Sequence, residues 1–317
     1  DPAQHAQLRA SLEERRRALG AQDLERVPPP PPHRATAARV RALDTLPQPP
    51  DFARHVLTNT PLDHIWKFIN PVMLYGRHLG VRAPVRLLDT PAEGTLRETS
   101  QGQKALEVKA LVDGLKAELK ATGFRPRAVF RFFRAAGEGN HLHLFTPEGA
   151  PLVSWELPRQ AKDGGQCISD WVAPATNGVP RDHVALFVTT AGGGIRERAE
   201  RYKDEGSFLK MHAVQALALE TAEAYAEYLH TQLRGMWGIP DAPDTSMLQR
   251  FRAEYTGKRY SFGYPACPDL EDQRLLFQLL KPADIGVELT DGFMMEPEAS
   301  VSALVLHHPD AAYFSVG

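Results

Sequence analysis

Residues 127–133 (RAVFRFF), 141–145 (HLHLF) and 151–157 (PLVSWEL) are three short segments rich in aromatic and branched side chains. Turns that contain glycine separate them, and this spacing predicts consecutive antiparallel strands. Residues 183–189 (HVALFVT) predict one more buried strand. Because strands and helices do not alternate as repeated βαβ units, we expect an α+β fold. Its twisted, mainly antiparallel sheet would be flanked by helices, in contrast to a doubly wound parallel sheet.

Two long helices are expected beside this sheet. Leucines near helical spacing predict one around 95–119, and a stronger one runs from about 207 to 236 with Ser207 in the N-cap position. One face of the second helix should pack against the sheet, and it carries Val214, Leu217, Thr221, Ala224, Tyr225 and Tyr228. Its other side carries Glu223 and Glu227 one turn apart, which is unfavourable unless a cation or ligand lies nearby. A solvated face is the simpler interpretation of that pair.

The C-terminal part predicts a short helix at 272–280 and strand-like segments near 287–294 and 300–307. Residues 311–316 (AAYFSV) also read as a strand. These elements add strands to the sheet without introducing a repeat.

The N-terminal part has a different character. Residues 3–19 are rich in strong helix formers, and the five consecutive prolines Pro28–Pro32 favour an extended, semi-rigid linker. We therefore expect an N-terminal helix and proline-rich interdomain linker over residues 1–50, followed by one large domain over residues 51–317. A helix followed by such a spacer indicates a piece of a larger protein, and a disordered tail is the alternative.

Composition limits the classes of function. The 317 residues are 43% hydrophobic and 24% charged, which is typical of soluble globular proteins. A net charge of -2 provides no positive field, so nucleic acid is not an expected partner. No apolar run approaches the ~20 residues that span a bilayer, so no membrane partner is expected. Only two cysteines, Cys167 and Cys267, are present, which favours a cytoplasmic location.

Three local patterns have simple structural interpretations. Gly192–Gly194 follows a predicted strand, but it lacks the spacing of a phosphate-binding loop, so a tight turn is favoured. His141 and His143 project from one face of a strand, but no cysteine or carboxylate cluster joins them, so no metal site is expected. Cys267 has no local histidine to act as its base, which favours a buried apolar role over nucleophilic catalysis.

Arg259–Pro268 (RYSFGYPACP) is the most unusual stretch of the chain. Gly263, Pro265 and Pro268 predict an extended, rigid backbone, and the small residues allow a flat ligand to approach main-chain polar groups. Arg259 offers a fork of donors suited to a carboxylate. Physical reasoning therefore indicates a loop that binds a small ligand.

The same stretch resembles the Arg-x-x-x-Gly-Tyr-Pro-Ala-Cys-Pro signature of the activation domain of cobalamin-dependent methionine synthase. Three further segments resemble that domain in the same order: SDWVAP from Ser169, AEAYAEYLH from Ala222 and LTDGFMMEPEASVSALVLHHPDAAYFSV from Leu289. The similarity covers residues from about 51 to 317. The preceding helix and linker resemble the connection from the cobalamin-binding domain.

The resemblance implies a reactivation module that binds S-adenosylmethionine. In that family the domain docks over inactive cob(II)alamin on the neighbouring domain, flavodoxin or an equivalent reductase supplies an electron, and the methyl group passes to cob(I)alamin. Zinc belongs to the homocysteine domain, which is absent from this chain. The isolated chain is therefore not expected to turn over, and no catalytic acid or base is expected in it.

The resemblance also implies a set of binding residues: Asn70, Glu223, Arg259, Gly263, Tyr264, Pro265, Ala266, Tyr313 and Phe314. Arg259 matches the arginine that holds the carboxylate of the ligand, and the Gly263–Ala266 backbone matches the part that lies along the adenosine. Tyr264 matches a tyrosine that faces the cobalamin. Tyr313 and Phe314 match an aromatic pair whose second member is a tyrosine in the family. We expect Arg259→Ala to weaken binding and leave the fold intact.

Several positions depart from the family pattern. Asn70 stands where the family has an aspartate, which replaces a charged partner of the ligand's amino group by a neutral one. Weaker binding is expected unless Glu223, which matches a groove glutamate, compensates. Glu296 and Glu298 replace an aromatic and a small residue, respectively, in part of the family. Two alternatives therefore stay open: a stand-alone S-adenosylmethionine-dependent methyltransferase, and a docking scaffold without ligand.

Overall fold

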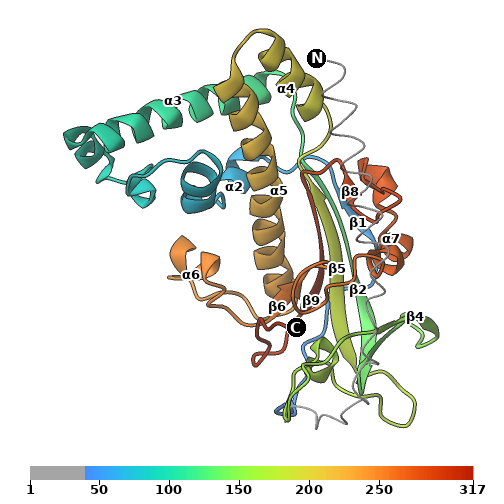
Figure 1. The fold of residues 1–317 in the computed structure, drawn as a ribbon. Coiled ribbons are helices and arrows are strands. Elements are labelled where there is room, and N and C mark those ends of the chain that lie inside the picture. Colours follow the sequence, from blue (N-terminus) through green and yellow to red (C-terminus); the bar gives the residue numbers. More distant parts are fainter. Residues whose placement is uncertain (1–39, 317) are drawn as a thin grey trace, which may run out of the picture.

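The chain is built on one antiparallel sheet, which has seven strands within residues 40–316, the part that the computed structural model describes. The strand order is β4-β3-β2-β5-β9-β6. Strand β1 pairs with the start of β2, whereas β3 pairs with its end. The strands are β1 (His55–Leu57), β2 (Arg127–Glu138), β3 (His141–Phe145), β4 (Pro151–Glu156), β5 (Asp182–Thr190), β6 (Lys258–Tyr260) and β9 (Ser300–Leu306). Each neighbouring pair is antiparallel, which confirms the predicted sheet (Figure 1).

Side chains of β2 alternate between two hydrophobic cores. Phe130 and Phe132 belong to the core under α5, whereas Val129 and Phe133 belong to the core on the opposite face. Alternation follows from the two-residue repeat of a strand. The sheet is therefore buried on both faces, which explains why β5 is buried along its whole length.

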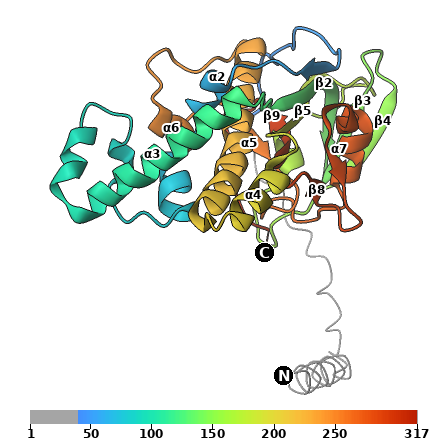
Figure 2. The ribbon, with the colours of Figure 1, turned by 90° about the horizontal axis from the view of Figure 1, so that it is seen from above.

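Helices cover the two faces of the sheet unequally (Figures 1 and 2). They are α2 (Leu62–Trp66), α3 (Ser100–Ala121), α4 (Ile195–Asp204), α5 (Phe208–Met236), α6 (Met247–Phe251) and α7 (Gln273–Leu280). Val72–His78 is a π-helix, and short 3-10 turns occur at Val85–Leu87, Glu93–Glu98, Ile168–Trp171 and Pro282–Ile285. No helix among residues 40–316 is long and apolar enough to cross a membrane.

Helix α5 is the main support of the sheet and confirms the stronger of the two predicted helices. Its buried side includes Val214, Leu217 and Tyr225, as its apolar pattern predicted. Thr189 on β5 donates a hydrogen bond to the carbonyl of Ala222, at 3.2 Å. Ser207 occupies the predicted N-cap position, but its side chain makes no capping hydrogen bond. Helix α5 instead continues from the turn that ends α4.

The region around α2 and α3 extends away from the sheet on the other side of α5 (Figure 1). The side chain of Thr99 caps α3 by accepting a hydrogen bond from the amide of Gly102, at 3.0 Å. Near its other end, Glu118 accepts hydrogen bonds from Arg198 and Tyr202 of α4, each at 2.6 Å. The helix predicted around 95–119 is confirmed.

Two predicted strands are wrong. Residues 287–294 contain only the two-residue strand β7 (Glu288–Leu289), which pairs with β8 (Met295–Glu296) across a turn. Residues 311–316 form no strand and run as an irregular tail. The helix predicted at 3–19 and the run Pro28–Pro32 lie outside the described residues. The proposed boundary at residue 51 stays a prediction.

Candidate functional site

A cavity of about 560 Å³ lies beside α5, between the segment around the π-helix, the start of β9 and the segment that follows β6. Small-ligand sites are commonly ~300 to 1,000 Å³. Its lining includes four of the predicted binding residues, Asn70, Glu223, Arg259 and Tyr264, which come from distant parts of the chain. π-Helical turns are rare and frequently occur at functional sites.

Arg259 on β6 provides the positive charge of this cavity. Its Nη1 lies 2.5 Å from Oε2 of Glu227, and its Nη2 lies 4.0 Å from Glu223. Burial alone would lower the pKa of the guanidinium, but the charge of Glu227 outweighs it and the pKa is raised. The paired glutamates of α5 therefore have the nearby cation that their spacing requires.

The partner of Arg259 is itself buried. The side chain of Glu227 is 9% exposed, and its second oxygen is buried without a hydrogen-bond partner among the described residues. Removing Arg259 would leave this carboxylate unpaired in a buried position. The expectation that Arg259→Ala leaves the fold intact is therefore revised: the residue both lines the cavity and stabilises the structure.

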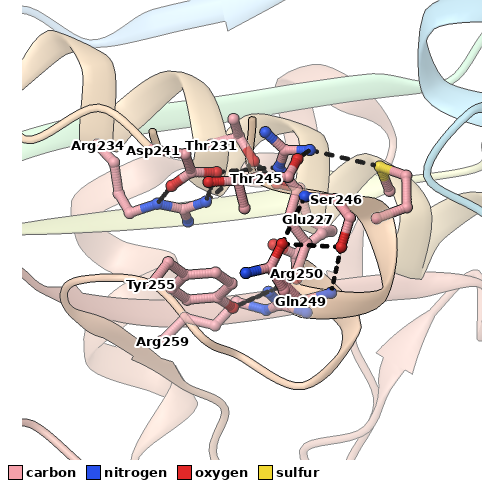
Figure 3. A network of polar contacts seen from close by, with 11 residues as sticks. Glu227, Thr231, Arg234, Asp241, Thr245, Ser246, Gln249, Arg250, Tyr255 and Arg259 are labelled. Atoms are coloured by element: carbon pink, nitrogen blue, oxygen red, sulfur yellow. Dashed lines mark hydrogen bonds and ion pairs between the residues drawn. The ribbon is translucent and has the colours of Figure 1, made fainter. Parts of the chain in front are cut away.

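A second ion cluster fixes the loop between α5 and α6, close to Arg259 (Figure 3). Arg234 of α5 donates from Nε and Nη2 to the two carboxylate oxygens of Asp241, at 2.7 Å each, and Arg250 donates to Asp241 at 3.0 Å. The guanidinium of Arg234 lies 3.8 Å from the ring centre of Tyr255. The hydroxyl of Tyr255 lies 3.5 Å from Nη1 of Arg259. The cluster thus connects α5, the α6 loop and β6.

The motif that follows Arg259 forms a tight turn, so the predicted extended backbone is wrong. The amide of Gly263 donates to the carbonyl of Cys267 and the amide of Cys267 donates to the carbonyl of Tyr264, both at 2.9 Å. Pro265 and Ala266 occupy the corner of this turn. Pro265 is exposed and Ala266 is buried, so the two residues face different surroundings.

Gly263 has a structural reason to be glycine. Its φ is +84°, and a Cβ atom there would lie 2.6 Å from Cδ2 of Leu270. We expect Gly263→Ala to lower the free energy of unfolding by about 1–3 kcal/mol, because it combines left-handed strain with a close contact. Urea denaturation measures this loss. Gly139→Ala has a similar φ of +58° but no neighbour within 4 Å, and it separates strain from contact. Equal losses in the two variants would contradict the contribution of Leu270.

The predicted aromatic residues lie in two environments. Tyr264 lines the cavity and is 60% exposed. Tyr313 is exposed, and its ring centre lies 5.7 Å from that of Tyr260, the residue after Arg259. Phe314 packs instead against Trp171 in the second core, with ring centres 5.6 Å apart. Phe314 is outside the cavity lining, and its contact with a ligand stays a prediction.

Asn70 lines the cavity and also shapes its wall. Its Oδ1 accepts a hydrogen bond from the amide of Val72, at 3.0 Å, at the start of the π-helix. The side-chain oxygen of this residue therefore holds the backbone that borders the cavity. An aspartate could make the same bond and add a negative charge.

Two polar residues of the cavity were missed by the sequence analysis. Glu220 lines the cavity one turn before Glu223, and Nε2 of His78 lies 3.1 Å from its Oε1. The spacing of Glu220, Glu223 and Glu227 places all three on one side of α5. That spacing was available in the sequence, whereas the approach of His78 was not, because it depends on how the π-helix packs.

The chain matches the family model described as "Vitamin B12 dependent methionine synthase, activation domain" over residues 88–317. This chain belongs to that family. It is also 32% identical to the methionine synthase of Mycobacterium tuberculosis and 30% identical to that of Mycobacterium leprae, over 200 residues in each case. Each alignment covers 59% of this chain but only 17% of the relative, so the chain spans a small part of the length of these proteins.

A solved structure supports the fold of this activation domain. The crystal structure described as the MetH reactivation domain bound to AdoHcy matches with a TM-score of 0.77, covering 89% of this chain and 90% of that one. Sequence identity between the two is 24%. The α+β architecture with a mainly antiparallel sheet is therefore that of a methionine synthase activation domain.

The weaker candidate sites have structural roles. The rings of His141 and His143 stack with centres 5.8 Å apart, and no group of three or more potential metal ligands is present among residues 40–316. Gly192–Gly194 forms the turn from β5 into α4. Cys267 is buried, its thiol donates to the carbonyl of Ser261, and burial raises its pKa to about 12. Such a thiol is a poor nucleophile at neutral pH.

Proposed function

We propose that the cavity beside α5 binds S-adenosylmethionine, the methyl donor that restores an inactive cobalamin carried by a neighbouring domain of the same enzyme. The main support for this proposal is the arrangement of charge. Arg259 lies at one side of the cavity, and the carboxylates of Glu223 and Glu227 lie beside it. A ligand with a carboxylate, an ammonium and a sulfonium group matches such a mixture. The AdoHcy named for the solved relative is the demethylated form of this ligand.

The cavity residues suggest how the ligand would lie. Glu227 occupies Nη1 of Arg259, and among the described contacts Nη2 donates no hydrogen bond, so it is available to a ligand carboxylate. Asn70 and Glu223 would face the ammonium group. The turn at Gly263–Ala266 would lie along the adenosine, and the exposed Tyr264 would face the docked cobalamin.

The proposed reaction needs positioning more than acid or base catalysis. The sulfur–methyl bond breaks, its electron pair stays on sulfur as a neutral thioether, and the methyl carbon bonds to the cobalt of the reduced cobalamin. An electron from flavodoxin or an equivalent reductase precedes this transfer. Orienting the donor contributes several kcal/mol, with ~7 to 11 kcal/mol as the upper range for aligned reactants. We also propose that the module is cytoplasmic and has no nucleic-acid or membrane partner. The isolated chain should not turn over.

Calorimetric titration of the chain with S-adenosylmethionine tests the proposal. We expect one saturable site, because the charged cavity is already formed without ligand. S-Adenosylhomocysteine should bind at the same site and compete. A silent titration would favour the docking scaffold, and methyl transfer without a cobalamin domain would favour a stand-alone methyltransferase.

A further inference from the structure

Glu220 is a buried acid in the cavity wall to which the binding scheme above gives no role. The residue is 4% exposed, and its carboxylate contacts Nε2 of His78 at 3.1 Å. Within the described part of the chain, His78 is the only basic residue within 4.0 Å of this carboxylate. Carboxylates are rarely buried without a strong positive partner. The arrangement therefore leaves Glu220 able to interact with a cation in the cavity.

The protein offers little other positive charge to Glu220. Arg259 lines the same cavity, but it is paired with Glu227 and lies close to Glu223. Glu298 lines the cavity as well and adds a further negative charge at its exposed rim. The carboxylates that line the cavity thus outnumber its one arginine. A positively charged ligand group would balance this excess.

The pair formed by His78 and Glu220 loses a proton to solvent near neutral pH. Burial raises the pKa of Glu220 to about 7, and the charge of Glu223 adds to the effect. Burial lowers the pKa of His78, as do the charges of His212 and Arg77. The two groups titrate as a pair. When the pair loses its proton, one uncompensated negative charge remains in the cavity wall.

We propose that Glu220 is a specificity-determining residue whose carboxylate favours the positively charged sulfonium donor over the neutral thioether product. This inference rests on the S-adenosylmethionine binding proposed above. The donor and the product share an ammonium and a carboxylate and differ by one methyl group and one positive charge on sulfur, so a negative charge in the wall favours the donor through its sulfonium. A charge several ångströms away in a partly buried site changes affinity by about tenfold. The spent ligand would then be exchanged for fresh donor after each repair.

Glu220→Gln provides the direct test, because it removes the charge and keeps the shape and the contact with His78. At pH 8, calorimetry should show that S-adenosylmethionine affinity falls about tenfold more than S-adenosylhomocysteine affinity, because only the donor carries the sulfonium charge. Glu107→Gln is the matched control, since it makes the same chemical change on the exposed side of α3, outside the cavity lining, where solvent screens the charge. That variant should change both affinities by less than about twofold.

The pH dependence gives a second readout. Because the pKa of Glu220 is raised, its charge is absent below about pH 6 and present above about pH 8. Donor affinity in the unmodified protein should therefore rise across this interval, and the rise should be smaller in Glu220→Gln. Both proteins are titrated with the same ligand, so protonation of the ligand's own amino group cancels in the comparison.

The possible outcomes separate this inference from the proposed function. Equal losses for donor and product, or no loss in Glu220→Gln, would overturn the role of Glu220 while leaving S-adenosylmethionine binding intact. If the unmodified protein binds neither ligand, the proposed function itself is wrong. Glu220→Met is a second neutral variant if the glutamine variant does not fold. Glu220→Asp keeps the charge and should retain the preference for the donor.

Discussion

Arg259→Gln is expected to reduce S-adenosylmethionine affinity by about 100-fold or more and to lower the free energy of unfolding by about 3 kcal/mol. The loss of affinity follows from the charge-assisted hydrogen bonds to the ligand carboxylate, each worth ~1.5 to 3 kcal/mol. The loss of stability follows from Glu227, whose buried carboxylate would be left without its partner at 2.5 Å. Calorimetric titration and urea denaturation measure the two effects separately.

Two further variants make this test specific. Adding Glu227→Gln to Arg259→Gln should restore most of the stability, because no unpaired buried charge remains, but it should not restore binding. Arg274→Gln is the matched control, since Arg274 on α7 is about half exposed and lies outside the cavity lining. Unchanged affinity in a folded Arg259→Gln protein would refute the assignment of the carboxylate site.

The second large effect is expected at Asp241. Its side chain is 4% exposed and pairs with Arg234, whose side chain is 1% exposed. We expect Asp241→Asn to lower the free energy of unfolding by ~3 to 5 kcal/mol, because it leaves the buried guanidinium of Arg234 without a counter-charge. Urea denaturation measures the loss. Asp310→Asn removes the exposed ion pair with Arg41 and should cost less than about 1 kcal/mol.

The same cluster gives a pH dependence with a defined sign. Burial alone would raise the pKa of Asp241, but hydrogen bonds and charges from Arg234 and Arg250 outweigh it and lower the pKa. A carboxyl whose pKa is lower in the folded protein stabilises it above the unfolded value of about 3.9. That contribution is lost as the pH falls through the folded value. The Asp241→Asn variant should lack this part of the acid destabilisation, and a parallel loss in both proteins would contradict it.

The long elements were predictable because their local sequence patterns are strong. Short runs of aromatic and branched residues predicted β2 and β5, and the apolar side of α5 was visible over many turns. The strands β1 and β6 have three residues each, which is too short for a period to show. Their strand conformation comes from pairing with β2 and β9.

The site was predictable only in part. The resemblance placed Glu223, Arg259 and Tyr264 in one site, and the three residues do line one cavity. The ion pair between Arg259 and Glu227, and the contact of Glu220 with His78, join segments far apart in the chain. The turn at Gly263 was predicted as extended because proline and glycine fit both conformations, and hydrogen bonds such as that to Cys267 decide between them.

The irregular tail at 311–316 covers the aromatic side chains of Tyr260 and Trp171. Tyr260 donates a hydrogen bond to the carbonyl of Ala312 at 2.8 Å, Phe314 packs on Trp171, and the amide of Val316 donates to the carbonyl of Pro265 at 3.0 Å. Cleavage by a protease before this tail would expose aromatic rings next to the Arg259–Pro268 segment. Newly exposed apolar patches of this kind promote self-association, so a clipped preparation would aggregate and lose ligand at the same time.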